Sequence, residues 1–423
     1  MNTTGFSGPP EPASHIGRTH MKRYVTGALA ALTAFCLAGT AMADISDGKV
    51  KIGVLTDMSG VYSDITGKGS LLAAKMAIDD CLKAECKGMQ IEMISSDHQN
   101  KADVASATAR RWIDQEQVDV LADMSNASIQ LAIAPLVKEK NRVALFPGGT
   151  ARLTGDACQP DHVVQWMWDT YVQVAGVANR LTKPGTSWYL VTADYALGHQ
   201  LELDAKTAVT AKGGKFLGST RHPFPAVDLS SPLLAAQGSG ADIIALANAG
   251  GDTVAGIKTA REFGITDSKQ KLVAFFLTAN DVKSVGLPVA QGTLLTEGFY
   301  WNLDDGTRAF SERFKKEQGA MPSAIQAGVY SSILHYLKAV AAAKSDDAKT
   351  VVAKMRELPI KDDVVRNAKL REDGRMVHDF YVFQVKSPGS SKGEWDLYDL
   401  VGTIPGDEAF RSIADGKCPL LGK

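Results

Sequence analysis

The sequence has little net charge, and this limits the kinds of partner that we expect for it. The formal net charge is −1 over 423 residues. It becomes −3 without the first 43 residues, where three basic residues outnumber one acidic residue. The sequence also lacks a basic stripe and any block of like charge, which are typical of proteins that bind nucleic acid or anionic membranes. We therefore expect no nucleic acid partner and no binding to a membrane surface.

The motifs of common enzymes and cofactor sites are also missing. The sequence has no Walker A run and no G-x-S-x-G sequence. The segment Gly67-Lys68-Gly69 lacks the third glycine of a dinucleotide-binding loop. The histidines are scattered, without the spacing of a metal site. We expect a protein that is not an enzyme and that holds no cofactor and no metal.

Long apolar runs are missing apart from one short stretch near the N-terminus. Basic residues at 21–23 precede an apolar stretch at 25–39, and Ala41-Met42-Ala43 follows as a small-x-small cleavage site. This succession is typical of a secretory signal peptide, and no later segment has the roughly 20 apolar residues of a transmembrane helix. We expect residues 1–43, an N-terminal extension with the signal peptide, to be removed, leaving a soluble exported protein that starts at Asp44.

Cysteine is scarce, with five in the whole chain. Four remain after the signal peptide, and an even number in an oxidising compartment predicts two disulfides. Three pairings are possible. The least strained pairing joins Cys81 to Cys86, which are close in sequence, and leaves Cys158 to pair with Cys418. A zinc site is the alternative, but the spacing that it requires is missing.

The sequence does contain a repeated alternation of strand and helix patterns. One series runs through residues 50–146 and a second through residues 187–277. Alternation with short connections indicates mostly parallel sheets covered by helices, and about 380 residues exceed what a single core usually supports. We therefore predict an α/β fold with two Rossmann-like lobes.

The C-terminal segments are not expected to form a third domain. The helical patterns at 307–357 come with too few strands to build a core, so the chain is expected to return to the first lobe. Multiple crossings between the lobes would make a hinge. The expected boundaries are 44–165 with 302–373 for the first lobe, 166–301 with 374–410 for the second, and 411–423 for a tail that returns to the first lobe.

The turn after the first strand pattern is the first candidate site. The strand is nearly all apolar, and a polar turn from Asp57 to Ser63 follows it. Ligands of open α/β sheets bind beyond the carboxyl ends of the strands, which makes Asp57 and Tyr62 candidate ligand-binding residues. The alternative is that Asp57 and Ser59 only cap a turn that Gly60 allows.

A set of motifs occurs in order along the chain and gives it a family resemblance. The motifs are Lys51-Ile52-Gly53-Val54 with Met58-Ser59-Gly60, Met124-Ser125-Asn126-Ala127-Ser128, Phe146-Pro147-Gly148-Gly149-Thr150, Asp194-Tyr195-Ala196-Leu197-Gly198 and Asn248-Ala249-Gly250-Gly251-Asp252. Together they resemble the type I periplasmic solute-binding proteins of ABC importers, in the branched-chain amino acid (leucine-binding-like) family. The resemblance covers residues 44–423. It implies two lobes joined by a multi-strand hinge, a small ligand captured between them and docking on a permease in the inner membrane. We expect the protein to be a monomer.

The resemblance assigns ligand-binding roles to two loops of the first lobe. The loop after the third strand would offer hydroxyls and backbone N–H groups at a helix start to a ligand carboxylate, through Ser125, Asn126 and Ser128. Gly149 and Thr150, after the fourth strand, would bind through a backbone carbonyl and a hydroxyl. The alternatives are that a serine is a plain helix N-cap and that Thr150 is a turn residue.

In the second lobe the resemblance points to Tyr195 and Asn248, which follow two of its strands. Tyr195 is alternatively a packing aromatic with its hydroxyl in water. Four more aromatic residues near the expected crossings would either wall the cleft or pack in the core: Trp166, Trp168, Tyr300 and Trp301.

One departure from the family bears on the ligand. Amino acid binders present an acidic side chain after the strand that corresponds to residues 272–277, where it pairs with the ligand ammonium. This chain has Thr278 there and no carboxylate until Asp281. Because a buried ammonium without a charge partner is costly, we expect a small organic carboxylate, aliphatic, keto or aromatic, with Thr278 among its contacts.

Two alternatives to this function stay open. One is an amino-acid-binding protein of the same transporter family, and the other is a ligand-sensing subunit of a membrane receptor. Three acids elsewhere could replace the missing one and bind an amino group: Asp57, Asp123 and Asp252.

Overall fold

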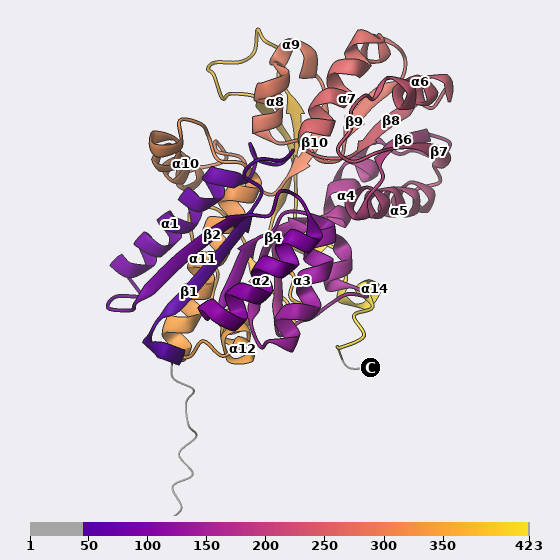
Figure 1. Cartoon of the computed structure of the whole chain (residues 1–423). Coiled ribbons are helices and arrows are strands. Elements are labelled where there is room, and N and C mark those ends of the chain that lie inside the picture. Colours follow the sequence, from indigo (N-terminus) through magenta and orange to yellow (C-terminus); the bar gives the residue numbers. More distant parts are fainter. Residues whose placement is uncertain (1–44, 422–423) are drawn as a thin grey trace, which may run out of the picture. The chain divides into compact units, whose positions relative to one another are not determined.

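The computed structural model describes residues 45–421 of the chain, which form two lobes with one main sheet each (Figure 1). No helix within that range is long and apolar enough to cross a membrane. The predicted signal peptide and the predicted start at Asp44 lie outside the described residues.

The first lobe contains a five-stranded parallel sheet in the order β2-β1-β3-β4-β5. Every residue of β3, β4 and β5 is buried, as expected for a parallel sheet that helices cover on both faces. The strands are β1 (Val50–Thr56), β2 (Ile91–Asp97), β3 (Val120–Asp123), β4 (Val143–Gly149) and β5 (Val163–Asp169).

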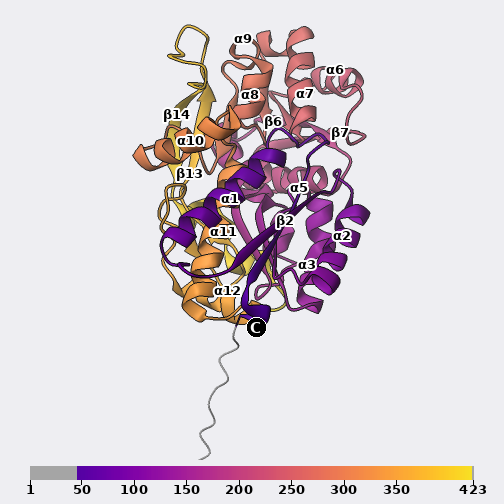
Figure 2. The same cartoon turned by 60° about the vertical axis from the view of Figure 1, so that its left-hand side comes forward.

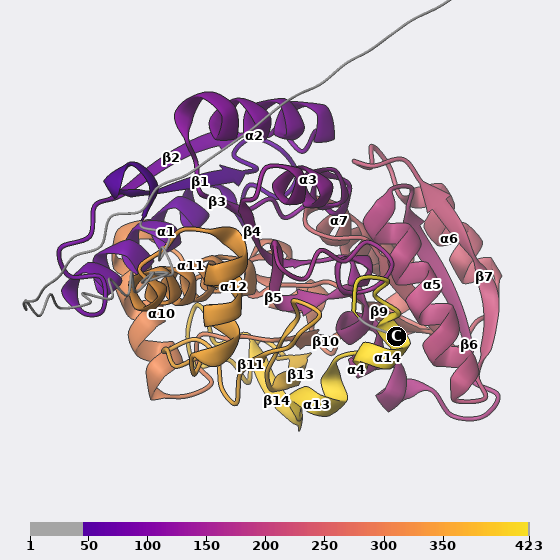
Figure 3. The same cartoon turned by 90° about the horizontal axis from the view of Figure 1, so that it is seen from below.

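Helices cover both faces of this sheet (Figure 3). The helix pair α2 and α3 lies on one face, and α11 packs against α1, α12 and β4 on the other. α11 is buried over nearly its whole length, and Figure 2 shows it beside α1 and α12. The helices are α1 (Gly67–Lys83), α2 (Ala102–Glu116), α3 (Ala127–Glu139), α10 (Asp305–Gln318), α11 (Ala324–Ala343) and α12 (Ala348–Glu357).

The second lobe contains a seven-stranded mixed sheet in the order β14-β13-β10-β9-β8-β6-β7. Its strands from β7 to β10 are parallel, and β13 and β14 extend the sheet as an antiparallel pair beside β10. The strands are β6 (Ser187–Ala193), β7 (Lys215–His222), β8 (Ile243–Ala247), β9 (Lys271–Ala274), β10 (Leu294–Glu297), β13 (Phe380–Val385) and β14 (Tyr398–Ile404).

The helices of the second lobe also form two groups. α4 packs on α5, while α7 packs on α6 and α8. The helices are α4 (Thr170–Leu181), α5 (Ala196–Ala211), α6 (Ser230–Gly238), α7 (Gly251–Glu262), α8 (Ala279–Val285) and α9 (Leu287–Ala290). The short elements of the chain are the 3-10 turns η1 (Ser46–Gly48), η2 (Ala151–Thr154) and η3 (Ile265–Asp267), the hairpin β11 (Lys369–Leu370) and β12 (Met376–Val377), and the helices α13 (Gly406–Ala409) and α14 (Ile413–Gly416).

Three segments lead from the elements of one lobe to those of the other. The chain passes from β5 into α4, from β10 into α10, and from β12 into β13. The parallel pairing of β5 with β4 continues as far as Asp169, which places residues 166–169 in the first sheet, beyond the boundary that we expected after residue 165. The second lobe therefore begins with α4.

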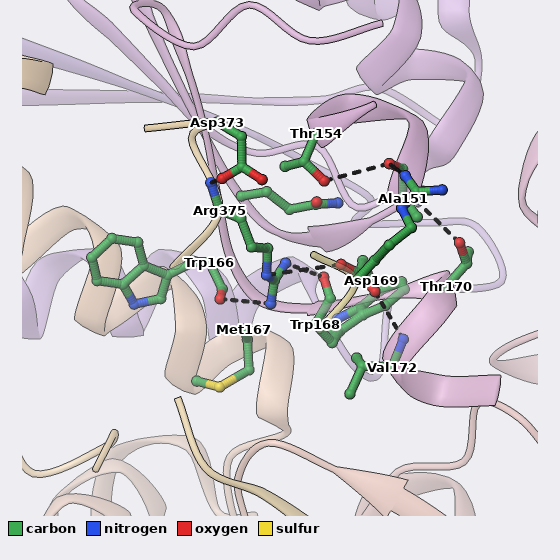
Figure 4. A network of polar contacts seen from close by, with 12 residues as sticks. Ala151, Thr154, Trp166, Met167, Trp168, Asp169, Thr170, Val172, Asp373 and Arg375 are labelled. Carbon is green, nitrogen blue, oxygen red and sulfur yellow. Dashed lines mark hydrogen bonds and ion pairs between the residues drawn. The ribbon is translucent and has the colours of Figure 1, made fainter. Parts of the chain in front are cut away.

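A buried arginine ties two of these crossings together (Figure 4). The guanidinium of Arg375, just before β12, donates to the carbonyl oxygens of Trp168 at 2.9 Å and Trp166 at 3.0 Å. It also lies 3.8 Å from the carboxylate of Asp169 and 4.0 Å from the ring centroid of Phe410. Because Asp169 is the N-cap of α4, the network fixes the end of β5 to the start of α4 and to the third crossing.

Both predicted disulfides are present. Cys81 pairs with Cys86 at the end of α1, and Cys158 pairs with Cys418. The second disulfide holds the C-terminal segment against the first lobe, where α14 packs on η2. The side chain of Arg411 adds a hydrogen bond of 2.8 Å to the carbonyl oxygen of Ala151 in η2.

Candidate functional site

The carboxyl ends of the parallel strands in the two lobes lie on either side of one interface. The loop after β1 reaches the second lobe, where the carbonyl oxygen of Val61 accepts a hydrogen bond of 3.3 Å from the backbone N–H of Gly251. The hydroxyl of Tyr62 in the same loop shares a hydrogen bond with the hydroxyl of Tyr195. The lobes are therefore in contact at the edge where open α/β sheets bind ligands.

The ring of Tyr62 sits in a socket of the second lobe, which we define by Tyr195, Phe224 and Gly250. The rings of Tyr195 and Phe224 stack, with centroids 4.0 Å apart and an angle of 11° between their planes, and the Tyr62 centroid lies 5.8 Å from that of Phe224. Gly250 has a φ of +59°, and a Cβ there would lie 2.8 Å from the Tyr62 ring. Burial raises the pKa of Tyr62 well above its usual value, so this phenol is neutral.

Asp57 organises the loop that carries Tyr62. Its two carboxylate oxygens accept hydrogen bonds from the backbone N–H groups of Gly60 at 2.7 Å and Tyr62 at 3.0 Å, and its side chain is buried. The turn-capping interpretation of Asp57 therefore describes its contacts in this structure.

The loop after β3 brings the three expected residues of the first lobe together at the start of α3. Asn126 is the N-cap of the helix, and its side-chain oxygen Oδ1 accepts from the backbone N–H groups of Ser128 at 2.8 Å and Ile129 at 3.2 Å. The hydroxyl of Ser125 donates to the carboxylate of Asp123 at 2.6 Å. The cap is thus an asparagine rather than either of the serines that we considered.

The end of β4 places Gly149 and Thr150 beside this loop. A Cβ on Gly149 would overlap the side-chain amide of Gln130, whose nitrogen donates to the carbonyl oxygen of Gly148. Thr150 is fully buried, and its hydroxyl accepts a hydrogen bond of 3.4 Å from the backbone N–H of Arg152, at the start of η2. Glycine is required at 149 because α3 packs so closely on the strand.

In the second lobe, Asn248 directly follows β8, and Thr278 follows β9 after three residues, at the start of α8; both are buried. The side-chain oxygen of Asn248 accepts from the hydroxyl of Thr253 at 2.8 Å, and its nitrogen lies 3.4 Å from a ring nitrogen of His222. Thr278 and Asp281 form a capping box at the start of α8. Burial raises the pKa of Asp281 to about 6.

Most acids at the starts of these loops and helices accept hydrogen bonds from nearby backbone or side-chain groups. Asp252 accepts from the backbone N–H of Ala226 at 3.0 and 3.1 Å. Burial raises the pKa of Asp123 above its usual value. Glu297, at the carboxyl end of β10, differs because its carboxyl accepts no hydrogen bond within residues 45–421, although it is 4 % exposed. Burial raises its pKa well above the usual value, and the charge of Asp281 adds to this effect.

Sequence reasoning missed some residues of the interface. Phe224 and Gly250 complete the socket of Tyr62, and Phe276 contacts Trp168 with ring centroids 4.7 Å apart. Gly250 lies in the motif at residues 248–252, which gave it no role of its own, and no local motif marks Phe224 or Phe276. Among the described residues no group of three or more His, Cys, Asp or Glu side chains could hold a metal ion.

The comparison with known families agrees with this geometry. The model of a family described as periplasmic binding protein matches residues 49–394. The chain belongs to this family. The match includes the first sheet, the second sheet except β14, and all three crossings, so it covers parts of both lobes and not one lobe alone.

Two solved structures are similar over most of the chain. A periplasmic binding protein from Burkholderia mallei is 43 % identical, with 89 % of this chain and 100 % of that chain covered and a TM-score of 0.84. A branched chain amino acid ABC transporter periplasmic ligand-binding protein from Burkholderia xenovorans LB400 is 38 % identical, with 88 % and 99 % covered and a TM-score of 0.77.

More distant proteins share the fold. A Leu/Ile/Val-binding protein homolog 6 from Brucella melitensis is 27 % identical over 340 residues, which are 77 % of this chain and 84 % of the relative. A solute-binding protein of an ABC transporter from Rhodopseudomonas palustris BisB5, solved in complex with 3,4-dihydroxybenzoic acid, is 20 % identical, with 85 % and 98 % covered and a TM-score of 0.74. The protein therefore has the fold of periplasmic substrate-binding proteins of ABC transporters.

Proposed function

We propose that this protein captures a small organic carboxylate between its two lobes and delivers it to an ABC permease in the inner membrane. The observation that carries the proposal is the contact of Tyr62 with Tyr195, Phe224 and Gly250 across the interface. A loop of one lobe that is buried in a socket of the other gives a closed state that a ligand can stabilise, provided that it binds this state better than the open one.

The first lobe offers suitable groups for the carboxylate. α3 contacts α5 of the second lobe. Backbone N–H groups at a helix start, together with the helix dipole, favour an anion. We propose that Ser125, Asn126 and Ser128 surround the carboxylate, that Gly149 and Thr150 contact it from β4, and that the ligand displaces part of the hydrogen bonding now made within this loop. Tyr195, Asn248 and Thr278 would contact the ligand from the second lobe.

The acids of the interface support a ligand without an ammonium group. Asp57 and Asp252 each accept hydrogen bonds from backbone N–H groups of nearby loops, and Asp123 accepts one from Ser125. Asp281 accepts from both the N–H and the hydroxyl of Thr278. Of the four, Asp123 alone keeps a buried carboxylate oxygen without a partner among the described residues. Burial raises the pKa of Asp123, which disfavours the charge that a buried ligand ammonium would need.

The relative solved with 3,4-dihydroxybenzoic acid is a carboxylate binder with the same fold. This relative supports the proposal that a protein with this fold can bind an aromatic acid. The side chains of the present protein determine whether it binds an aliphatic, a keto or an aromatic acid. The proposal includes no reaction, because binding and release are enough for delivery to a permease. We also propose that residues 1–43 are removed on export, which an intact-mass measurement of the secreted protein would test.

Matched ligand pairs would test the proposed ligand class by isothermal titration calorimetry. Leucine and 4-methyl-2-oxopentanoate share a carbon skeleton and differ in the ammonium group, and benzoate and benzamide differ in the carboxylate. We expect at least one acid without an amine to bind with micromolar or better affinity, and at least about tenfold more weakly when its carboxylate becomes an amide. Tight binding of leucine alone would refute this ligand class and leave transport intact.

One observation favours an amino acid as a second candidate ligand. Glu297 is a buried acid without a hydrogen-bond donor within residues 45–421, and an ammonium group would supply donors and a charge. If leucine binds, Glu297→Gln should weaken it by about tenfold or more, since a hydrogen bond to a charged group is lost. Unchanged leucine binding by this variant would exclude Glu297 as the ammonium partner.

A further inference from the structure

Two tryptophans on β5 differ in what their indole N–H groups contact. The N–H of Trp166 donates to the hydroxyl of Ser331 in α11 at 2.8 Å, inside the core of the first lobe. The N–H of Trp168, two residues further along the strand, has no acceptor among the described residues, although the side chain is only 4 % exposed. A buried donor without an acceptor costs free energy, so a hydrogen-bond acceptor beside this N–H would stabilise the protein.

The position of Trp168 shows where such a partner would have to lie. Its indole lies directly on Gly148, so that a Cβ on Gly148 would overlap the ring nitrogen. Gly148 precedes Gly149 and Thr150, which we place at the carboxylate. On the other side, the ring centroid of Phe276, from the segment after β9, lies 4.7 Å away. The indole therefore lies at the interface of the lobes, at the carboxyl end of the first sheet.

Trp188 serves as a reference for this inference. It is also a buried tryptophan whose N–H has no acceptor among residues 45–421. It lies near the amino end of β6, however, and packs in parallel with Phe275, with ring centroids 6.3 Å apart. The two tryptophans thus share the same unpaired group, and only Trp168 presents it beside the predicted ligand loops.

We propose that Trp168 is a ligand-binding residue that selects an aromatic carboxylate. Its indole N–H donates to an oxygen of the ligand, and its ring forms a wall with Phe276 against which a planar ligand packs. Pairs of aromatic rings favour offset or edge contacts with centroids about 4.5–7 Å apart, as in the contact of Trp168 with Phe276. The inference rests on the proposed function, because it requires that a carboxylate binds between the lobes.

Two conservative variants separate a role in binding from a role in packing. Trp168→Phe keeps an aromatic ring and removes the N–H, and Trp188→Phe makes the same change away from the interface. Binding of 4-hydroxybenzoate and of 4-methyl-2-oxopentanoate would be measured by calorimetry for the wild type and both variants. Native mass spectrometry of the three proteins, purified in parallel, would report the occupancy of any small molecule that the wild type retains.

We expect the wild type to prefer 4-hydroxybenzoate. Trp168→Phe should bind it about ten- to a hundredfold more weakly, whereas Trp188→Phe should stay within about twofold of the wild type. Three results would overturn the inference about Trp168 and leave the proposed function standing. They are equal binding by Trp168→Phe and the wild type, equal losses of affinity in the two variants, and a preference of the wild type for 4-methyl-2-oxopentanoate. A wild type that binds neither probe and retains no molecule would overturn the proposed function and this inference with it.

Discussion

The socket of Tyr62 can be tested by adding a single methyl group at Gly250. A Cβ at this position would lie 2.7 Å from the carbonyl oxygen of Val61 and 2.8 Å from the ring of Tyr62, and both residues belong to the opposite lobe. Gly250→Ala should therefore obstruct the closed state and leave the open state free of this clash. Ligand affinity should fall because the ligand stabilises the closed state.

Gly250→Ala has two effects, and only one of them changes the affinity for the ligand. The φ of +59° and the ψ of −133° define a conformation that disfavours alanine by about 1–3 kcal/mol in the open and the closed state alike. The clash exists only in the closed state, where overpacking typically costs about 1–3 kcal/mol. This second cost predicts a loss of affinity of about five- to a hundredfold.

Gly264, just beyond the other end of α7, provides the matched control. Its φ is +68°, and a Cβ there would have no atom within 4 Å. Gly264→Ala should leave ligand binding unchanged. It should lower thermal stability less than Gly250→Ala, because Gly264 has the left-handed conformation with a ψ of 15°, which alanine adopts at a smaller cost. Calorimetry and thermal unfolding of both variants would separate the two effects, and small-angle X-ray scattering would report whether the lobes still close. Equal affinities of the two variants would refute the role of the socket.

Further predictions concern the hinge, the disulfides and the cap of α3. His378, at the third crossing, donates to the carbonyl oxygen of Met167, and burial lowers its pKa to about 4. The stability that the neutral ring contributes is complete above pH 6.5 and is lost as the pH falls toward 4. Over this range, chemical denaturation should show that the wild type loses up to about 3 kcal/mol more stability than His378→Gln. The Cys158–Cys418 disulfide spans a separation of 260 residues. In the chain-entropy model, its removal by double serine substitution should lower the free energy of unfolding by up to about 5 kcal/mol and lower the Tm more than removal of the Cys81–Cys86 disulfide. An equal or smaller decrease in Tm would contradict this. Asn126→Ala should destabilise the protein by about 1 kcal/mol through loss of the α3 cap, and unchanged unfolding in denaturant would disprove the role of the cap.

Much of the fold follows from local sequence patterns. The strand at Val50–Thr56 and the helices at Gly67–Lys83 and Ala127–Glu139 form where apolar periodicity predicts them. The crossing strands β5 and β10 were not predicted. β5 passes into α4 without any intervening turn residues, and β10 has only four residues, so neither gives the punctuation or the length on which such predictions depend.

The candidate site was predictable as a set of loops and less so as a set of contacts. Asp57, Asn126 and Thr278 lie in segments that follow strands, as the sequence indicates, but their side chains cap their own loops in this structure. Caps and ligand-binding groups use the same residue types, so the sequence alone could not separate these roles. The contact of Trp168 with Phe276 depends on how the two lobes meet, which no local pattern encodes.

The most direct test of the ligand class is a competition for the wild-type cleft. Purified protein would be incubated with an equimolar mixture of leucine, 4-methyl-2-oxopentanoate, benzoate and 4-hydroxybenzoate, freed of unbound ligand and examined by native mass spectrometry. We expect one molecule of an acid without an amino group to be retained per protein chain. Retention of leucine, or of no molecule from the mixture, would contradict capture of an amine-free carboxylate between the lobes.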